Sequence, residues 1–230
     1  MDISLHYTKT GSGFPLLLLH GNGEDSTYFE HQVPVFSKRF TVYAIDTRGH
    51  GQSPMGTAPF ALSQFADDLL AFMDEHDLPQ ADILGFSDGG NIALIFALRY
   101  PDRVRRLVLN AANLHPTGIK TRYLTEMQRE REAVDESTAE GRYQAQLLDL
   151  MLLEPNLTSK DLWAITCPTL VIAGRYDVIV ENHTRLMALA IPGAKLAIIP
   201  GEHDCAFRNP AEFNAAVERF FEETSQEEPL

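Results

Sequence analysis

The sequence predicts an α/β fold, with a mostly parallel sheet of about seven strands flanked by helices. Short, continuously apolar runs recur along the chain, which is typical of parallel strands covered on both faces. Stretches with helical spacing lie between these runs, and strands that alternate with helices favour a parallel sheet. One such stretch, NIALIFALRY at residues 91–100, is apolar nearly all round, which indicates a helix buried against the sheet.

The expected strands and helices can be placed in order along the chain. Residues 3–8 alternate weakly between apolar and polar, and we expect an edge strand there. The later runs are expected to be parallel strands covered on both faces, and they span residues 16–19, 41–45, 81–86, 104–110, 169–173 and 195–199. A helix with one buried face is expected where apolar residues recur at helical spacing, namely at Leu62, Phe65, Leu69, Phe72 and Met73.

The alternation of strands and helices stops between about residues 114 and 162. This segment is helical in character and rich in charge, and it includes a second apolar portion, AQLLDLMLLEP. Ligands of open α/β sheets bind beyond the carboxyl ends of the strands, so an insertion that follows a strand end is expected to cover the site. We therefore predict a core of residues 1–113 and 163–230 and a helical lid of residues 114–162.

Composition limits the partners of the protein. With 230 residues, 44% of them hydrophobic, the chain is long enough to bury a sizeable core. Its net charge of −13 argues against nucleic acid and anionic membranes as partners. Two cysteines, Cys167 and Cys205, allow at most one disulfide, and no apolar run matches a signal peptide or a membrane span. We expect a cytoplasmic protein that acts on a small molecule without a metal or a cofactor; the oligomeric state stays open.

The pentapeptide Gly-Phe-Ser-Asp-Gly at residues 85–89 lies between a predicted strand and a predicted helix. A serine on such a tight turn adopts a strained backbone, and residues two positions away must be small to avoid clashes. Gly85 and Gly89 meet this condition, so the stretch matches a nucleophile elbow with Ser87 as the nucleophile. A serine that caps a helix in a glycine-rich turn is an equally good interpretation of the pentapeptide alone.

A serine nucleophile needs a base to take its proton and a third group to orient that base. Asp177 follows the predicted strand TLVIAG, and His203 follows the predicted strand KLAIIPG. The order Ser87, Asp177, His203 is the one expected for this arrangement. No acid follows the strand that ends at Asn110, so Asp177 is the predicted orienting acid and His203 the predicted base.

Acyl transfer also needs hydrogen-bond donors for the oxyanion. We predict that these are the backbone N–H groups of Asp88, next to the nucleophile, and of Asn22, in the loop after the strand LLLL. The side chain of Asp88 is then free, and we predict that it binds a substrate ammonium group. The alternative is that it only places a favourable charge at a helix N-terminus. His20 and His50 are expected to brace their loops.

Five motifs together resemble the series of the α/β-hydrolase superfamily: HGNG at residues 20–23, DTRGHGQS at 46–53, GFSDGG at 85–90, GRYD at 174–177 and GEHD at 201–204. The resemblance spans nearly the whole chain apart from the predicted lid. It implies a serine hydrolase that cleaves a small ester, thioester or related acyl bond through an acyl-enzyme. The Ser-Asp-Gly-Gly elbow most resembles the valacyclovir hydrolase-like members, which cleave amino-acid esters.

Other activities remain open at this point. The same three residues serve carbon–carbon bond hydrolases, and a lyase or synthase acting on a carboxylate would call for an arginine-lined pocket, which the predicted lid can supply from Arg122, Arg129, Arg131 and Arg142. A non-catalytic hydrolase-fold receptor is expected to lack a member of the set. An oxidoreductase is suggested by GNGEDS and Asp46, which imitate a dinucleotide fingerprint, but Ser26 replaces its third glycine.

Overall fold

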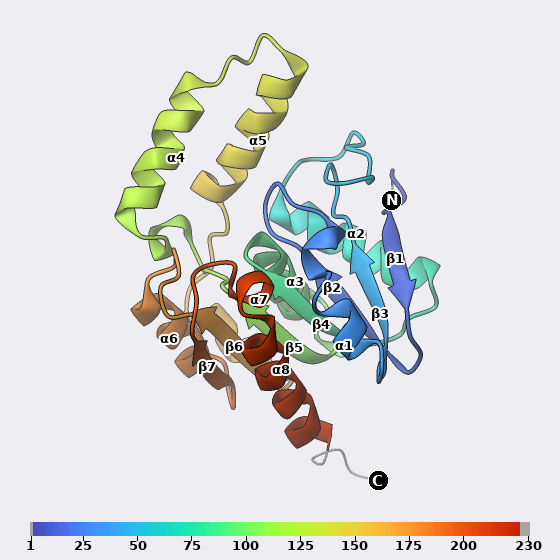
Figure 1. The fold of residues 1–230 in the computed structure, drawn as a ribbon. Helices are drawn as coiled ribbons and strands as arrows, with labels where there is room; N and C mark the ends of the chain where they lie inside the picture. Colours follow the sequence, from blue (N-terminus) through green and yellow to red (C-terminus); the bar gives the residue numbers. More distant parts are fainter. Residues whose placement is uncertain (1, 226–230) are drawn as a thin grey trace.

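Seven strands form one sheet in the computed structural model, which describes residues 2–225 (Figure 1). The strand order is β1-β3-β2-β4-β5-β6-β7. Only β1 runs antiparallel to its neighbour β3, and the other neighbouring pairs are parallel. The predicted α/β fold with a mostly parallel sheet is therefore confirmed.

The six later strands lie within two residues of their predicted positions. The first strand differs, since it begins at Tyr7 and not at residue 3. The N–H of His6 donates to Ser53 Oγ at 2.8 Å, so the pairing between β1 and β3 starts at the next residue, Tyr7. The strands are β1 Tyr7–Thr10, β2 Phe14–Leu19, β3 Phe40–Ile45, β4 Ala81–Phe86, β5 Val104–Asn110, β6 Thr169–Gly174 and β7 Lys195–Ile199.

Helices cover both faces of the sheet, and each face has its own core. Leu17 and Leu19 of β2 pack with α2, α3 and α6 on one face, while Leu16 and Leu18 pack with α1, α7 and α8 on the other. The helices are α1 Val33–Phe36, α2 Leu62–Glu75, α3 Asp88–Arg99, α4 Thr121–Ala133, α5 Ala139–Leu153, α6 Glu181–Ala190, α7 Cys205–Arg208 and α8 Pro210–Ser225. Four short 3-10 helices are η1 Ser26–Phe29, η2 Pro101–Arg103, η3 Pro116–Gly118 and η4 Asp161–Ala164.

Between β5 and β6 the chain leaves the sheet and forms α4 and α5, which extend side by side from one end of the molecule (Figure 1). Helix α5 buries Ala145, Leu148 and Leu150, whereas α4 has no buried residue. Helix α5 is thus the part of this insertion that packs on the core. In residues 2–225, no helix has both the length and the apolar character needed to cross a membrane.

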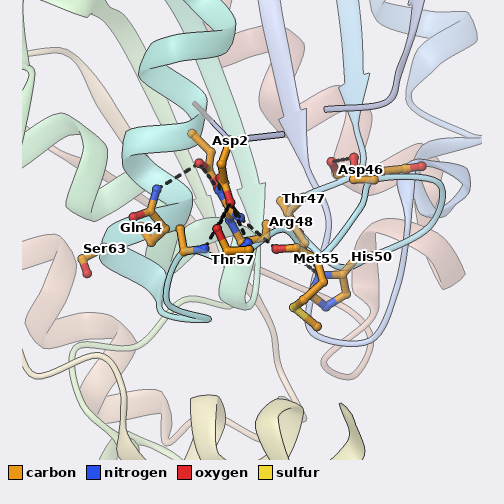
Figure 2. Close-up of polar contacts among 12 residues, drawn as sticks. Asp2, Asp46, Thr47, Arg48, His50, Met55, Thr57, Ser63 and Gln64 are labelled. Atoms are coloured by element: carbon orange, nitrogen blue, oxygen red, sulfur yellow. Dashed lines mark hydrogen bonds and ion pairs between the residues drawn. The ribbon is translucent and has the colours of Figure 1, made fainter. Parts of the chain in front are cut away.

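A buried ionic network fixes the loop that follows β3. The side chain of Arg48 is fully buried, and it donates to both carboxylate oxygens of Asp68 on α2 at 2.7 Å. Arg48 also pairs with Asp2 at 2.7 Å and donates to the carbonyl of Met55 (Figure 2). The N-terminus, the loop and α2 are therefore joined at one guanidinium group.

Candidate active site

The carboxyl ends of the parallel strands bring three of the predicted residues together. Ser87 follows β4, Asp177 follows β6 and His203 follows β7. His203 Nε2 lies 3.0 Å from Ser87 Oγ, and His203 Nδ1 lies 2.6 Å from Asp177 Oδ1. Residues that are 116 and 26 positions apart in the sequence thus form one hydrogen-bonded chain.

The backbone at Ser87 has the strained conformation expected of an elbow, with a φ of +52°. A Cβ atom at Gly85 would lie 2.1 Å from the carbonyl oxygen of Gly89, and one at Gly89 would lie 2.1 Å from that of Leu19. Both positions therefore require glycine. The side chain of Ser87 makes no capping bond to α3, so the helix-cap interpretation does not describe its contact with His203.

The surroundings of Asp177 determine how the imidazole is held. Its carboxylate is buried, and Oδ1 accepts a second bond from the N–H of Ile179 at 2.9 Å. A carboxylate only accepts hydrogen bonds, so the proton of a neutral His203 belongs on Nδ1. The lone pair on Nε2 then faces the hydroxyl of Ser87, as proton transfer from the serine requires.

The loop after β2 carries the predicted oxyanion donor Asn22. Within residues 2–225, the backbone N–H groups of Asn22 and Asp88 have no hydrogen-bond partner. His20 braces this loop, because it contacts the carbonyl of Gly21 through Nδ1 at 2.7 Å and accepts the N–H of Thr47 at Nε2. Burial lowers the pKa of His20, which keeps the ring neutral in this role.

Glu24 also shapes this loop, although it was not predicted from the sequence. Its carboxylate accepts the N–H of Gly21 at 3.1 Å, and it lines a pocket together with Ser87 and His203. Burial raises the pKa of Glu24 to about 7. Its position two residues after Asn22 in HGNGED is the only hint that the sequence offers.

The carboxylate of Asp88 is buried, and neutral donors hold it. Oδ2 accepts from Asn22 Nδ2 at 2.9 Å, and Oδ1 accepts from Asn91 Nδ2 at 3.1 Å. Asn91 is itself bonded to Asn113. Burial raises the pKa of Asp88, and no lysine or arginine of the described chain forms an ion pair with it. The sequence did not predict Asn91, Asn113 or the side-chain contacts of Asn22.

Two pockets meet at Ser87 and His203. The first, of about 290 Å³, lies between the sheet edge and the helical insertion; its acidic lining residues are Asp88, Glu126, Glu130 and Glu154, and its apolar ones include Tyr123, Met127, Met151 and Ile179. The second, of about 350 Å³, is lined by Glu24, Tyr176, Glu202 and Asp204, among others. No lysine or arginine from residues 2–225 lines either pocket.

The suggestion of an arginine-lined site is therefore wrong. Arg131 pairs with Asp149 and Glu136, and Arg142 donates to the carbonyl of Glu136, both beside a different pocket on the insertion. Arg122 stacks on the ring of its neighbour Tyr123, and Arg129 is exposed and lines none of the pockets described. Acidic residues of the insertion neutralise Arg131, and the charged residues that the insertion places in the pocket beside Ser87 are acidic.

The oxidoreductase alternative also fails on geometry. The carboxylate of Asp46 accepts the N–H groups of Ser26 and Gln52 and contacts the ring of His6. These local contacts leave Asp46 bound within its own loops and not free for a ribose. The GNGEDS segment leads into the four-residue η1, so no long helix offers its N-terminus to a pyrophosphate.

Comparison with known proteins places the chain in a family. The family model of the alpha/beta hydrolase fold matches residues 15–138, more than half of the chain. The chain belongs to the α/β-hydrolase family. This agrees with the resemblance of its five motifs and with the sheet order and elbow described above.

Relatives of this α/β-hydrolase chain differ in their named activities. Serine hydrolase BPHL of Mus musculus is 31% identical over 243 residues, which cover 96% of this chain and 84% of that protein. The 2-hydroxymuconate semialdehyde hydrolase of Pseudomonas putida is 32% identical, over 93% of this chain and 89% of that protein. A thermophilic esterase from Thermogutta terrifontis is 26% identical with a TM-score of 0.82, over 96% of this chain and 94% of that one. The family is therefore established, and the substrate class is open.

Proposed function

We propose that this chain is a serine hydrolase that cleaves small esters with an ammonium group on the acyl part. Ser87 is the nucleophile, His203 the base and Asp177 the acid that orients the base. The single observation that carries this proposal is the pair of bonds made by His203, 3.0 Å to Ser87 Oγ and 2.6 Å to Asp177 Oδ1. The helical insertion of residues 114–162 acts as the lid of the site.

The reaction follows from these positions in two halves. His203 Nε2 takes the proton of Ser87 as Oγ attacks the ester carbonyl, and the N–H groups of Asn22 and Asp88 stabilise the oxyanion. His203 then gives the proton to the leaving alcohol, and the acyl group remains on Ser87. In the second half, His203 deprotonates a water molecule that attacks the acyl-enzyme, and the serine regains its proton.

Preference for a cationic acyl part rests on Asp88. Its carboxylate is buried beside the nucleophile, where only the amides of Asn22 and Asn91 donate to it. A substrate ammonium in the first pocket would add the missing positive charge, and such a charge-assisted bond is worth about 1.5–3 kcal/mol. We call the Asp88 carboxylate and the adjoining part of this pocket the cation subsite. The acidic lining of the pocket also supports this assignment.

A carbon–carbon bond hydrolase is the second candidate. The relationship to 2-hydroxymuconate semialdehyde hydrolase favours it, and the same Ser87, His203 and Asp177 would serve. A muconate derivative carries a carboxylate, however, and the pockets beside Ser87 combine acidic residues with no lysine or arginine among the described lining residues. Repulsion between the substrate carboxylate and these acidic residues makes carbon–carbon bond hydrolysis less well supported than ester hydrolysis.

The first test addresses the nucleophile. A fluorophosphonate probe should label Ser87 alone, as read by mass spectrometry, and Ser87→Ala should abolish ester turnover without loss of the fold. Ser63→Ala, which removes an exposed serine on α2, is the control and should retain full turnover. Labelling at another residue, or turnover by Ser87→Ala, would disprove the assignment of the nucleophile.

The second test addresses the substrate. Esters of an α-amino acid and of the desamino acid of equal size should differ by roughly ten- to a hundredfold in kcat/KM, in favour of the amino ester, if the cation subsite acts as proposed. Asp88→Asn should abolish this ratio chiefly through the KM of the amino ester. Equal rates for both esters in the unmodified protein would refute the cation subsite, while turnover of a muconate semialdehyde alone would favour the second candidate.

A further inference from the structure

Asn22 joins three parts of the molecule through one side chain. It lies in the loop after β2, and its Nδ2 donates to Asp88 Oδ2 at 2.9 Å and to the carbonyl of Leu147 at 3.2 Å. Asp88 is the first residue of α3, and Leu147 lies in α5 of the insertion. A single amide thus connects the oxyanion loop, the nucleophile elbow and the lid.

The orientation of this amide is fixed by its neighbours. A carboxylate oxygen and a carbonyl oxygen both accept hydrogen bonds, so the NH₂ group of Asn22 must face them. Its two N–H bonds then serve one acceptor each, and both donors are used. The side chain of Leu147 also lies near the next residue of the loop, since a Cβ atom added at Gly23 would be 3.9 Å from Leu147 Cδ1. Helix α5 therefore rests on residues 22–23 of the loop.

Asp88 depends on this contact for its direction. Asn91 holds Oδ1, and Asn22 holds Oδ2, so the carboxylate plane is set by one donor on each oxygen. Asn91 belongs to the same helix as Asp88 and moves with it. Asn22 is the donor that comes from outside this helix, and its own position depends on Leu147 of α5. Displacement of α5 would leave one N–H of Asn22 without an acceptor.

We propose that the side chain of Asn22 is a positioning residue that aims the Asp88 carboxylate into the pocket and makes this aim depend on the docked position of α5. This inference rests on the cation subsite of the proposed function and adds a coupling between that subsite and the lid. The Asp88 carboxylate is then oriented to bind a substrate ammonium only when α5 is packed on the core. Binding of a cationic acyl group and docking of the lid therefore stabilise each other.

The experiment compares the ratio of kcat/KM for the amino ester and its desamino counterpart. Asn22→Ala and Asn22→Leu should each lower this ratio, by no more than Asp88→Asn does and mainly through the KM of the amino ester. Leucine retains the branched Cγ of asparagine without its donors, whereas alanine removes that branch, so agreement between the two variants separates hydrogen bonding from packing. Any general effect on the oxyanion loop acts on both esters and cancels in the ratio. Asn182→Ala, at an exposed site on α6, is the matched control.

A pH titration gives a readout that a purely structural role would not change. Loss of a donor disfavours the ionised carboxylate, so the pH at which the KM of the amino ester improves should move upward in both Asn22 variants. The other titratable groups that face the pocket are Tyr123, Glu126 and Glu130 of α4, Glu154 at the end of α5 and His203, and they are unchanged in these variants. An unchanged midpoint would contradict the proposal.

The dependence on α5 is tested by a double-mutant cycle. Leu150→Ala removes a buried side chain that packs α5 on the core, and it should lower the ratio in the unmodified protein but have little further effect in Asn22→Ala. Leu148→Ala, at a second buried position of α5, replaces it if the first variant does not fold by circular dichroism. Leu189→Ala, at an exposed leucine of α6, is the control. Additive effects would overturn the coupling.

The outcomes separate this inference from the proposed function. If the unmodified protein prefers amino esters and Asp88→Asn abolishes that preference, the cation subsite stands. Asn22 variants that keep the preference, or that slow both esters by the same factor, would then overturn the role of Asn22 alone. Absence of any Ser87-dependent preference in the unmodified protein would overturn both.

Discussion

Asp177 lies at the end of the hydrogen-bonded chain and is bound by its neighbours on one oxygen. Oδ1 accepts from both His203 and the N–H of Ile179, while Oδ2 is buried with no hydrogen-bond partner among the described residues. We predict that Asp177→Asn lowers kcat by a factor on the order of 10⁴, as in the serine-protease template. The amide would hold the wrong tautomer of His203. Stopped-flow or steady-state assays on a desamino ester measure this, and a loss below about tenfold would assign the orienting role to another acid.

Glu24 provides a prediction about stability and pH. Burial raises its pKa to about 7, whereas an unfolded glutamate ionises near ~4.3. Between these values the folded protein retains a proton that the unfolded chain has released, so this group lowers stability as pH rises from about 4.3 to about 7. Glu24→Gln should therefore stabilise the protein more at pH 8 than at pH 4.5, as measured by urea unfolding of both proteins. An equal difference at the two pH values would show that Glu24 carries no such penalty.

The sequence was sufficient to choose Ser87, Asp177 and His203 as candidates, because parallel strands bring their carboxyl ends to one edge of the sheet. The position of each residue directly after a strand was therefore enough to predict that the three side chains lie close together. Asn91 and Glu24 escaped notice because their importance lies in where the side chain points, and no spacing rule encodes a contact such as the one from Asn22 to Asp88 across 66 residues.

At the scale of elements, the elbow depends on how closely β2, β4 and α3 approach. A Cβ atom at Gly89 would lie 2.1 Å from the carbonyl oxygen of Leu19 and 2.5 Å from that of His20, so helix and strand must separate to admit it. We predict that Gly89→Ala destabilises the protein by about 1–3 kcal/mol or more and impairs turnover by displacing Ser87. Chemical denaturation and ester assays measure the two effects.

Gly193 is the control for this element. Its φ is +70°, but an added Cβ would have no neighbour within 4 Å. Gly193→Ala should therefore show only the backbone cost of a left-handed residue, about 1–2 kcal/mol, with turnover unchanged. If Gly89→Ala behaved like Gly193→Ala in both assays, close packing at the elbow would not be what requires glycine there.

The helical insertion was predictable as an element but not in its contacts. A break in the alternation of strands and helices located it between β5 and β6, where α4 and α5 are found. Its arginines were considered as pocket residues, yet Arg131 turns to Asp149 and Glu136. Both helices carry mixed charges, and which charges meet depends on how α4 packs beside α5, which a single helical pattern does not specify.

At the scale of the whole molecule, the alternation of Leu16 to Leu19 between two cores explains why apolar runs predicted the sheet so well. A strand covered on both faces is apolar at nearly every position, and the two cores on either side of β2 account for the apolar run of that strand. The edge strand β1 was predicted less well, because it is largely exposed and its start depends on the contact from His6 to Ser53.

Buried polar contacts hold the layers of the fold to the loops, and the network around Arg48 allows their contribution to stability to be measured. Its guanidinium has no exposed surface, and it pairs with Asp68 of α2. It also bridges Asp2 and the carbonyl of Met55 (Figure 2). Removal of one partner from a buried pair leaves an unpaired charge, which costs about 3–5 kcal/mol. Arg48→Ala should show a loss of this size in urea unfolding. Arg48→Lys should recover only part of it, because an ammonium does not reproduce the two parallel bonds to Asp68.

Arg39 supplies the matched comparison at the surface. It pairs with Glu222 at 3.0 Å, and both side chains are about half exposed. Exposed pairs contribute about 0–1 kcal/mol, so Arg39→Ala should change the free energy of unfolding by no more than that.

The loop held by Arg48 also includes Thr47, which donates to the His20 ring that braces the oxyanion loop. Arg48→Lys should therefore lower kcat for amino and desamino esters by the same factor, and a change in their ratio would show that this network reaches the cation subsite as well.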